Sequence, residues 1–107
     1  SLAAEEQAVV ERFLHEEKVR EILFRPGKVL VEQHISDTRT FGIVDRLIIA
    51  PDRITLIDFK TGRVGHLADK YRPQMLRYRM ILQGLFAGRP VECYLLFVDE
   101  PQRIVII

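Results

Sequence analysis

Asp45 and Asp58 are the residues of this sequence whose types and spacing point most clearly to chemistry. They lie in two β-rich runs, Thr40 to Ala50 and Arg53 to Lys60, which a tight turn at Pro51 joins. If the hairpin turns symmetrically, opposed residues have numbers that sum to 103, and Asp45 lies directly across from Asp58. Two carboxylates about 5 Å apart on an apolar face repel each other. Hard oxygen ligands suit Mg²⁺ or Mn²⁺, so the pair predicts a divalent metal site.

Strand alternation predicts the surroundings of the two carboxylates. It puts Asp45 on an apolar face and puts Asp58 on one face with Lys60. The apolar residues that share the predicted face of Asp45 are Phe41, Ile43, Leu47 and Ile49. A lysine at this place could orient an attacking water or balance charge on a phosphoryl group. The structural alternative remains open, in which both aspartates are solvated at the sheet end or paired with Lys60.

A helix predicted over Tyr71 to Phe86 supplies a second polar group, with Pro73 in its first turn. Gln74 and Tyr78 are four residues apart and therefore share one helix face. Gln74 could hydrogen-bond the sheet end or a phosphate oxygen. Three arginines point elsewhere around the helix and would make sequence-independent phosphate contacts: Arg72, Arg77 and Arg79.

The other elements follow from hydrophobic periodicity. The predicted order is helix, three strands, helix and two strands, which is an α/β fold. Because the central strands are apolar on both sides, we expect helices to cover both faces of the sheet. The remaining predicted elements are a helix from Leu2 to about Leu14, a short helix around Val19 to Leu23, and strands over Lys28 to Ile35, Val91 to Val98 and Arg103 to Ile107.

Composition limits the class of protein. A length of 107 residues fits one domain, and 48% hydrophobic with 29% charged residues is typical of a soluble globular chain. No apolar run reaches the ~20 residues of a membrane span and no leader is visible, so we expect a cytoplasmic protein. The single cysteine, Cys93, excludes an internal disulfide and any multi-cysteine metal site, and we expect it in a buried strand. The first residue is Ser and the last four are Ile-Val-Ile-Ile, which favours a fragment of a larger chain.

The charge is distributed unevenly along the chain. Residues 1–24 contain six acids and three bases, a balance of −3, whereas residues 60–79 contain six bases and one acid, a balance of +5. A local positive field on a nearly neutral domain suits a bound polyanion. A solvated helix face is the alternative interpretation.

Three segments carry a resemblance to a known family. They are Gly42-Ile43-Val44-Asp45-Arg46-Leu47, then Ile57-Asp58-Phe59-Lys60-Thr61-Gly62, then Tyr71-Arg72-Pro73-Gln74-Met75 with Tyr78. In this order they resemble the G-x-x-D, D-x-K-T and Q-x-x-x-Y motifs of RecB-type nucleases in the PD-(D/E)XK superfamily. The likeness is closest to the C-terminal nuclease domain of AddA-type helicase-nucleases, and it runs from about Phe24 to the end. It implies a restriction-endonuclease-like core with a mixed central sheet flanked by helices.

The resemblance also assigns roles by position. It makes Asp45, Asp58 and the backbone carbonyl of Phe59 ligands of Mg²⁺ or Mn²⁺, and it makes Lys60 the catalytic lysine. Gln74 and Tyr78 become helix residues that face the site. Glu32 matches an acidic position that supports the ligands, with a surface salt bridge as the alternative. The residues expected to contact DNA are Arg63, Lys70, Arg72, Arg77 and Arg79.

The sequence departs from the family pattern at one ligand. The family usually adds a histidine from an upstream helix, but the surroundings of His15 do not match, so we expect that helix to lie before Ser1. The isolated chain is then expected to bind metal weakly or to cut slowly. Branches of the family that hold an iron–sulfur cluster are excluded because Cys93 is alone.

These observations favour a Mg²⁺-dependent DNA nuclease module, acting as an exonuclease or endonuclease in double-strand break repair. Its expected partners are DNA, the helicase portion of the parent chain and a second nuclease or helicase subunit, with no membrane. Since no G-x-x-x-x-G-K motif is present, ATP hydrolysis would belong to another part of the parent chain. The alternatives are a catalytically silent module that binds DNA or a partner, and a structural domain with solvated carboxylates.

Overall fold

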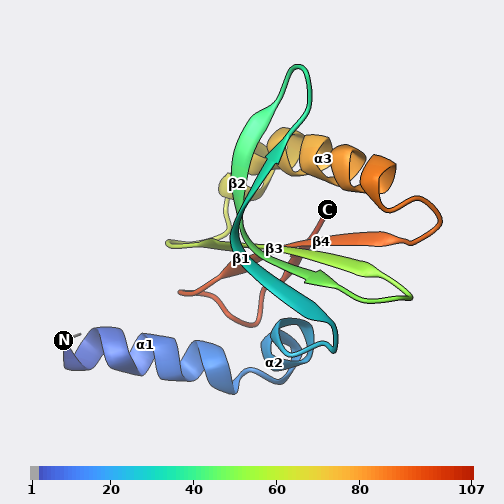
Figure 1. Ribbon diagram of the computed structural model, residues 1–107. Helices are drawn as coiled ribbons and strands as arrows, with labels where there is room; N and C mark the ends of the chain where they lie inside the picture. Colours follow the sequence, from blue (N-terminus) through green and yellow to red (C-terminus); the bar gives the residue numbers. More distant parts are fainter. Residues whose placement is uncertain (1–2) are drawn as a thin grey trace.

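Eight helices and strands follow one another along residues 3–107, the part of the chain that the computed structural model describes (Figure 1). The order of helix and strand types is as predicted, while the predicted start at Leu2 lies outside the described residues. The elements are α1 (Ala4–His15), α2 (Glu17–Leu23), β1 (Lys28–Ser36), β2 (Phe41–Ile49), β3 (Ile54–Lys60), α3 (Leu67–Leu85), β4 (Val91–Phe97) and β5 (Val105–Ile106).

The strands form one mixed sheet in the spatial order β1-β2-β3-β4-β5. Only β3 and β4 pair in parallel, because α3 crosses over between them. The helix α3 lies on one face of the sheet, and α1 and α2 lie on the other (Figure 1). Each face therefore has its own core, one around Met75, Tyr78 and Leu82 of α3 and one around Phe13 and Ile22. The expectation of a sheet covered on both faces is confirmed.

The register of the central hairpin is the predicted one. Arg46 pairs with Ile57, and Ile49 pairs with Ile54, so each pair of numbers sums to 103. The turn closes through a hydrogen bond of 3.0 Å from the Ala50 N–H to the Arg53 carbonyl. The pairing ends at Arg46 and Ile57, one position short of the predicted Asp45–Asp58 pair, and Asp58 lies two residues before the end of β3.

The predicted alternation along β2 is wrong at Asp45. Val44 and Leu47 both belong to the core under α3, although strict alternation would put residues three apart on opposite faces. Phe41 is consequently 69% exposed rather than sharing a face with Leu47, which is 3% exposed. The reason is a local distortion of the β1–β2 pair. Glu32, which would lie opposite Asp45, has φ +49°, and the pairing skips from Val31–Arg46 to Gln33–Val44.

The third helix begins earlier than predicted, and Pro73 is therefore inside it instead of in its first turn. A turn in which the Leu67 N–H donates to the Val64 carbonyl starts the helix at Leu67. Pro73 cannot donate to the carbonyl of Asp69, but Asp69 is exposed, so water can satisfy that carbonyl. The last strand is also shorter than predicted, because a turn between Glu100 and Arg103 takes up its first residues.

Two further expectations are met. Cys93 is fully buried in β4, as expected for a small core residue. Within residues 3–107, no helix is both long enough and apolar enough to span a membrane.

Candidate active site

The carboxylates of Asp45 and Asp58 come together at the carboxyl end of β3. Asp45 uses one oxygen, Oδ2, to accept a hydrogen bond of 2.8 Å from the backbone N–H of Phe59, the residue that follows Asp58. Asp58 is 9% exposed and lies on the α3 side of the sheet with Lys60. The Lys60 Nζ is 2.6 Å from Asp58 Oδ2. The predicted meeting of the two aspartates is thus present, and so is the salt bridge that was the structural alternative.

The environment of Asp58 disfavours its ionised form. Burial raises the pKa of the Asp58 carboxyl to about 6, and the neighbouring Asp45 carboxylate acts in the same direction. The Lys60 ammonium opposes both effects without cancelling them. At neutral pH the pair is therefore a concentration of negative charge that one ammonium does not fully balance, and it favours an additional cation.

Lys60 has a second contact, which the sequence analysis did not assign. Its Nζ lies 3.7 Å from the centroid of the Tyr71 ring, close enough for a cation–π interaction. Tyr71 belongs to the first half of α3 and packs against the core under that helix. The only local signal was its place three residues before Gln74 on the same helix face.

Tyr78 lies on the same face of α3, but it contacts β2. It is 3% exposed, and a Cβ placed on Gly42 would come within 1.7 Å of its hydroxyl oxygen. The ring therefore occupies the space that the missing side chain of Gly42 leaves free. Gln74, one turn earlier, is exposed. Tyr78 joins the first and third sequence motifs by direct packing.

Glu32 lies beside the site along the sheet. The β1–β2 pairing skips the position where Glu32 would face Asp45, and the Glu32 side chain is exposed. The structure thus places a backbone distortion at Glu32, opposite Asp45, and the supporting role of the Glu32 side chain stays a prediction.

Two acidic side chains that the sequence analysis missed, Asp99 and Glu100, accept backbone hydrogen bonds from the loop that follows Lys60. Asp99 accepts a hydrogen bond from the Gly62 N–H, and Glu100 accepts one of 2.8 Å from the Val64 N–H. The Val98 N–H donates to the Lys60 carbonyl at 2.9 Å. These contacts join residues more than thirty positions apart, so no local pattern indicates them.

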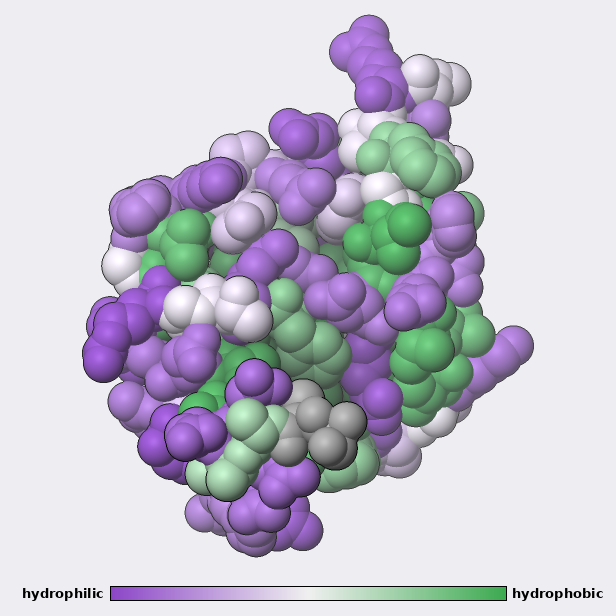
Figure 2. Space-filling view, turned by 90° about the vertical axis from the view of Figure 1, so that its left-hand side faces the viewer, coloured by the Kyte–Doolittle hydropathy of each residue, from purple (hydrophilic) through white to green (hydrophobic). Residues whose placement is uncertain are grey.

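The basic residues expected to contact DNA differ in availability. Arg63, Lys70 and Arg77 are exposed, and Arg72 is half-buried. Arg79 instead donates a hydrogen bond of 2.6 Å to the carbonyl of Ile107. Figure 2 views the end of the sheet where β3 and β4 finish, and it shows a mostly hydrophilic face with separate hydrophobic patches.

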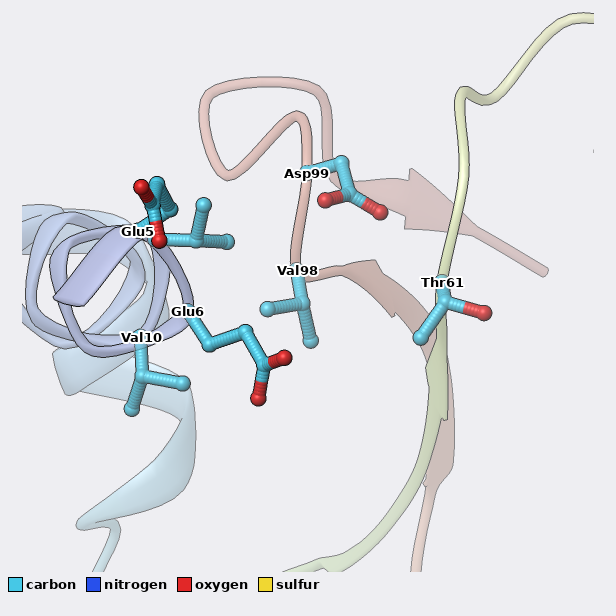
Figure 3. Close-up of a pocket in the computed structure, with 7 residues that line it drawn as sticks. Glu5, Glu6, Val10, Thr61, Val98 and Asp99 are labelled. Carbon is cyan, nitrogen blue, oxygen red and sulfur yellow. The ribbon is translucent and has the colours of Figure 1, made fainter. Parts of the chain in front are cut away.

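A hollow of about 310 Å³ lies on the other side of the same strand end, between α1 and the residues that follow β3 and β4 (Figure 3). Valines and carboxylates line it, among them Glu5, Glu6 and Asp99. It contains neither Asp45 nor Asp58. The three acidic side chains in this lining disfavour phosphate.

The donor atoms fit a hard divalent cation. The side chains offer two adjacent carboxylates, Asp45 and Asp58, with a net negative charge. The N–H and C=O of one strand residue point to the same neighbour, so the Phe59 carbonyl is directed toward β2, where its N–H meets Asp45. In residues 3–107 no group of three or more His, Cys, Asp or Glu side chains converges as a metal site. A metal here would depend on these two carboxylates, the carbonyl and water.

The fold and the carboxylate pair define a nuclease of the PD-(D/E)XK type. The family model of the PD-(D/E)XK nuclease superfamily matches residues 1–105, and the chain belongs to this superfamily. Nucleases of this superfamily generally use divalent metal ions.

The relatives are large bacterial proteins. The chain is 40% identical, over 53% of its length, to an ATP-dependent helicase/nuclease subunit of Desulforudis audaxviator (strain MP104C). It is 28% identical over 78% of its length to the protein of the same name from Lactococcus lactis subsp. lactis (strain IL1403). It is 26% identical, over the same share, to the exonuclease/helicase subunit RexA of Lactococcus lactis subsp. cremoris (strain MG1363). The chain spans 5% of the first of these relatives and 7% of the other two.

Proposed function

We propose that this chain is the nuclease module of an AddA-type helicase-nuclease and that it hydrolyses DNA phosphodiester bonds with Mg²⁺ or Mn²⁺. The observation that carries the proposal is the pairing of the half-buried Asp45 with the buried Asp58 near a strand end, with Lys60 in contact with Asp58. The resemblance of the surrounding motifs to those of RecB-type nucleases supports it.

Each residue has a part in this proposal. Asp45, Asp58 and the Phe59 carbonyl hold the ion, which supplies Lewis-acid stabilisation of charge on the phosphate when bound. Lys60 orients the attacking water toward the phosphorus. Gln74, which is exposed one turn before Tyr78, hydrogen-bonds a phosphate oxygen. Tyr78 packs against Gly42 and so holds β2 in place under α3.

DNA contact is proposed for the basic residues on the α3 side. Arg63, Lys70, Arg72 and Arg77 bind backbone phosphates, whereas Arg79 is left out because it already binds the Ile107 carbonyl. The helicase portion, ATP hydrolysis, a partner nuclease or helicase, and a cytoplasmic role in double-strand break repair are proposed for the longer protein that contains this module.

A nuclease assay tests the proposal. The longer protein and the 107-residue chain are compared side by side with Mg²⁺ and with chelator, as wild type, Asp58→Asn and Asp52→Asn. Asp52, an exposed aspartate in the hairpin turn, is the matched control. We expect cleavage only with Mg²⁺, a loss of about 100-fold or more for Asp58→Asn, and wild-type rates for Asp52→Asn. Cleavage that survives Asp58→Asn in the longer protein contradicts the proposal.

A silent DNA- or partner-binding module is the second candidate. The observation in its favour is that no third acidic or histidine side chain joins the pair among residues 3–107. It predicts salt-sensitive DNA binding that is indifferent to Mg²⁺ and unchanged by Asp58→Asn. Calorimetry with Mn²⁺ separates the metal-dependent nuclease from a purely structural domain, for which neither binding heat nor a rise in Tm is expected.

A further inference from the structure

The ammonium of Lys60 has two contacts of different kinds. One is the ion pair with Asp58 Oδ2 at 2.6 Å, and the other is the face of the Tyr71 ring at 3.7 Å from its centroid. The Lys60 side chain is only 19% exposed, so water contributes little to its solvation. The ring therefore replaces part of the hydration that the ammonium loses at this place.

The two contacts respond differently to a cation at the carboxylates. A divalent ion competes with Lys60 for the oxygens of Asp58, because both are positive. The Tyr71 ring is neutral and offers no ligand atom facing the ammonium, so its hold on Lys60 does not compete with metal binding. Without the ring, the four-carbon stem of lysine would be free to populate other rotamers.

We propose that Tyr71 is a positioning residue that holds the Lys60 ammonium beside the carboxylate pair through its ring face. The inference rests on the proposed nuclease function and adds a residue to it. Tyr71 acts through Lys60 and does not itself touch the reacting atoms. The hydroxyl of Tyr71 is dispensable for this role, because the electron-rich face of the ring attracts the Lys60 ammonium.

Two substitutions in the longer protein separate the ring from the rest of the side chain. Tyr71→Phe keeps the ring, and we expect kcat within about twofold of wild type. Tyr71→Leu removes the ring, and we expect kcat to fall about tenfold while KM for DNA changes less than about twofold. In a Lys60→Ala background, Tyr71→Leu has no further effect, because its action passes through Lys60. Equal losses in both backgrounds, or a large loss for Tyr71→Phe, would overturn the proposal.

A graded series covers the case in which Tyr71→Leu fails to fold. Phenylalanines with increasing ring fluorination at position 71 keep the size of the ring and withdraw electrons from its face. The proposal predicts that kcat falls stepwise along the series. Constant kcat with a folded protein contradicts it.

NMR of the metal-free 107-residue chain provides a readout other than activity. The ring current of Tyr71 shifts the ε-methylene protons of Lys60 upfield, and we expect this shift in the wild type and in Tyr71→Phe but not in Tyr71→Leu. Phe24→Leu removes an exposed aromatic ring at the end of α2 and is the matched control, with the shift retained. If the wild type shows the shift but the longer protein cuts no DNA, the proposed function fails and the Lys60–Tyr71 contact stands. If the longer protein cuts DNA and no shift is seen, the function stands and the role of Tyr71 fails.

Discussion

The Asp58 carboxyl is held where its charge is unfavourable. Its folded-state pKa of about 6 lies above the ordinary value of 3.8, with burial as the largest cause and Asp45 adding to it. Between these two values the folded state binds more protons than the unfolded state, so the free energy of unfolding falls as the pH rises from about 4 to about 6. Above about pH 6 the ionised Asp58 carboxylate destabilises the folded state by its full amount. Such an arrangement is typical of functional sites, which trade stability for reactivity.

Replacement of Asp58 by Asn is therefore expected to stabilise the metal-free protein. Asparagine has the same shape without the charge, so the expected gain in the free energy of unfolding at pH 8 is about 1 to 3 kcal/mol. Urea unfolding with chelator, measured for wild type and Asp58→Asn, gives this difference. The difference should shrink as the pH falls and vanish near pH 3 and below, where the carboxyl is protonated in both the folded and the unfolded state. A destabilised Asp58→Asn at pH 8 would mean that the Lys60 ion pair outweighs burial and repulsion.

At the scale of elements, the position of the carboxylates depends on how α3 packs against β2. Tyr78 fills the space above Gly42, three residues before Asp45, and it is buried in the core under α3. No side chain fits between this ring and the β2 backbone. The motif glycine and the motif tyrosine are thus the two sides of one packing contact between β2 and α3.

Gly42→Ala tests this contact. The added methyl would overlap the Tyr78 hydroxyl and two of its ring carbons, and we expect a loss of about 1 to 3 kcal/mol in the free energy of unfolding. Tyr78→Leu removes those atoms. The double variant should therefore lose less stability than the sum of the two single variants, as measured by urea unfolding. Additive losses would show that the two side chains do not share this space.

At the scale of the whole molecule, the sequence was sufficient for the architecture and for the central register. The order of elements follows from hydrophobic periodicity, and the short turn at Pro51 allows few alternatives for pairing β2 with β3. The alternation along β2 was wrong because the distortion comes from its neighbour, where Glu32 takes a positive φ. The early start of α3 was missed because its first turn is polar and is fixed by Val64, which packs in the core.

The candidate site was predictable where its residues share a hairpin and was not predictable where they meet across the fold. Asp45, Asp58 and Lys60 lie on adjacent strands, so the hairpin register brings Asp45 near Asp58, and alternation along β3 puts Lys60 on the face of Asp58, although alternation along β2 fails at Asp45. The contact of Lys60 with Tyr71 and the fastening of the Gly62 loop by Asp99 depend on tertiary packing. A pattern in one segment carries no information about such contacts.

The uneven charge of the chain becomes a difference between two faces in the folded molecule. Glu5 and Glu6 of α1, with Asp99, line the hollow beside the strand end, while the exposed bases follow Lys60 into α3. Phosphates are repelled by the first face and attracted by the second. The net charge of +1 hides this difference, so the proposed direction of DNA approach follows from the fold rather than from composition.

The consequence can be measured as the salt dependence of DNA binding in chelator, where no cleavage occurs. Changing Lys70, Arg72 and Arg77 together to Gln removes three proposed phosphate contacts, and the slope of log K against log salt should become shallower by about 2 to 3. Fluorescence anisotropy with labelled DNA gives this slope. Changing Glu5 and Glu6 to Gln is the control on the opposite face, and it should leave the slope unchanged, because no phosphate contact is lost there. If the two variants change the slope equally, DNA does not distinguish the faces, and the approach from the α3 side is wrong.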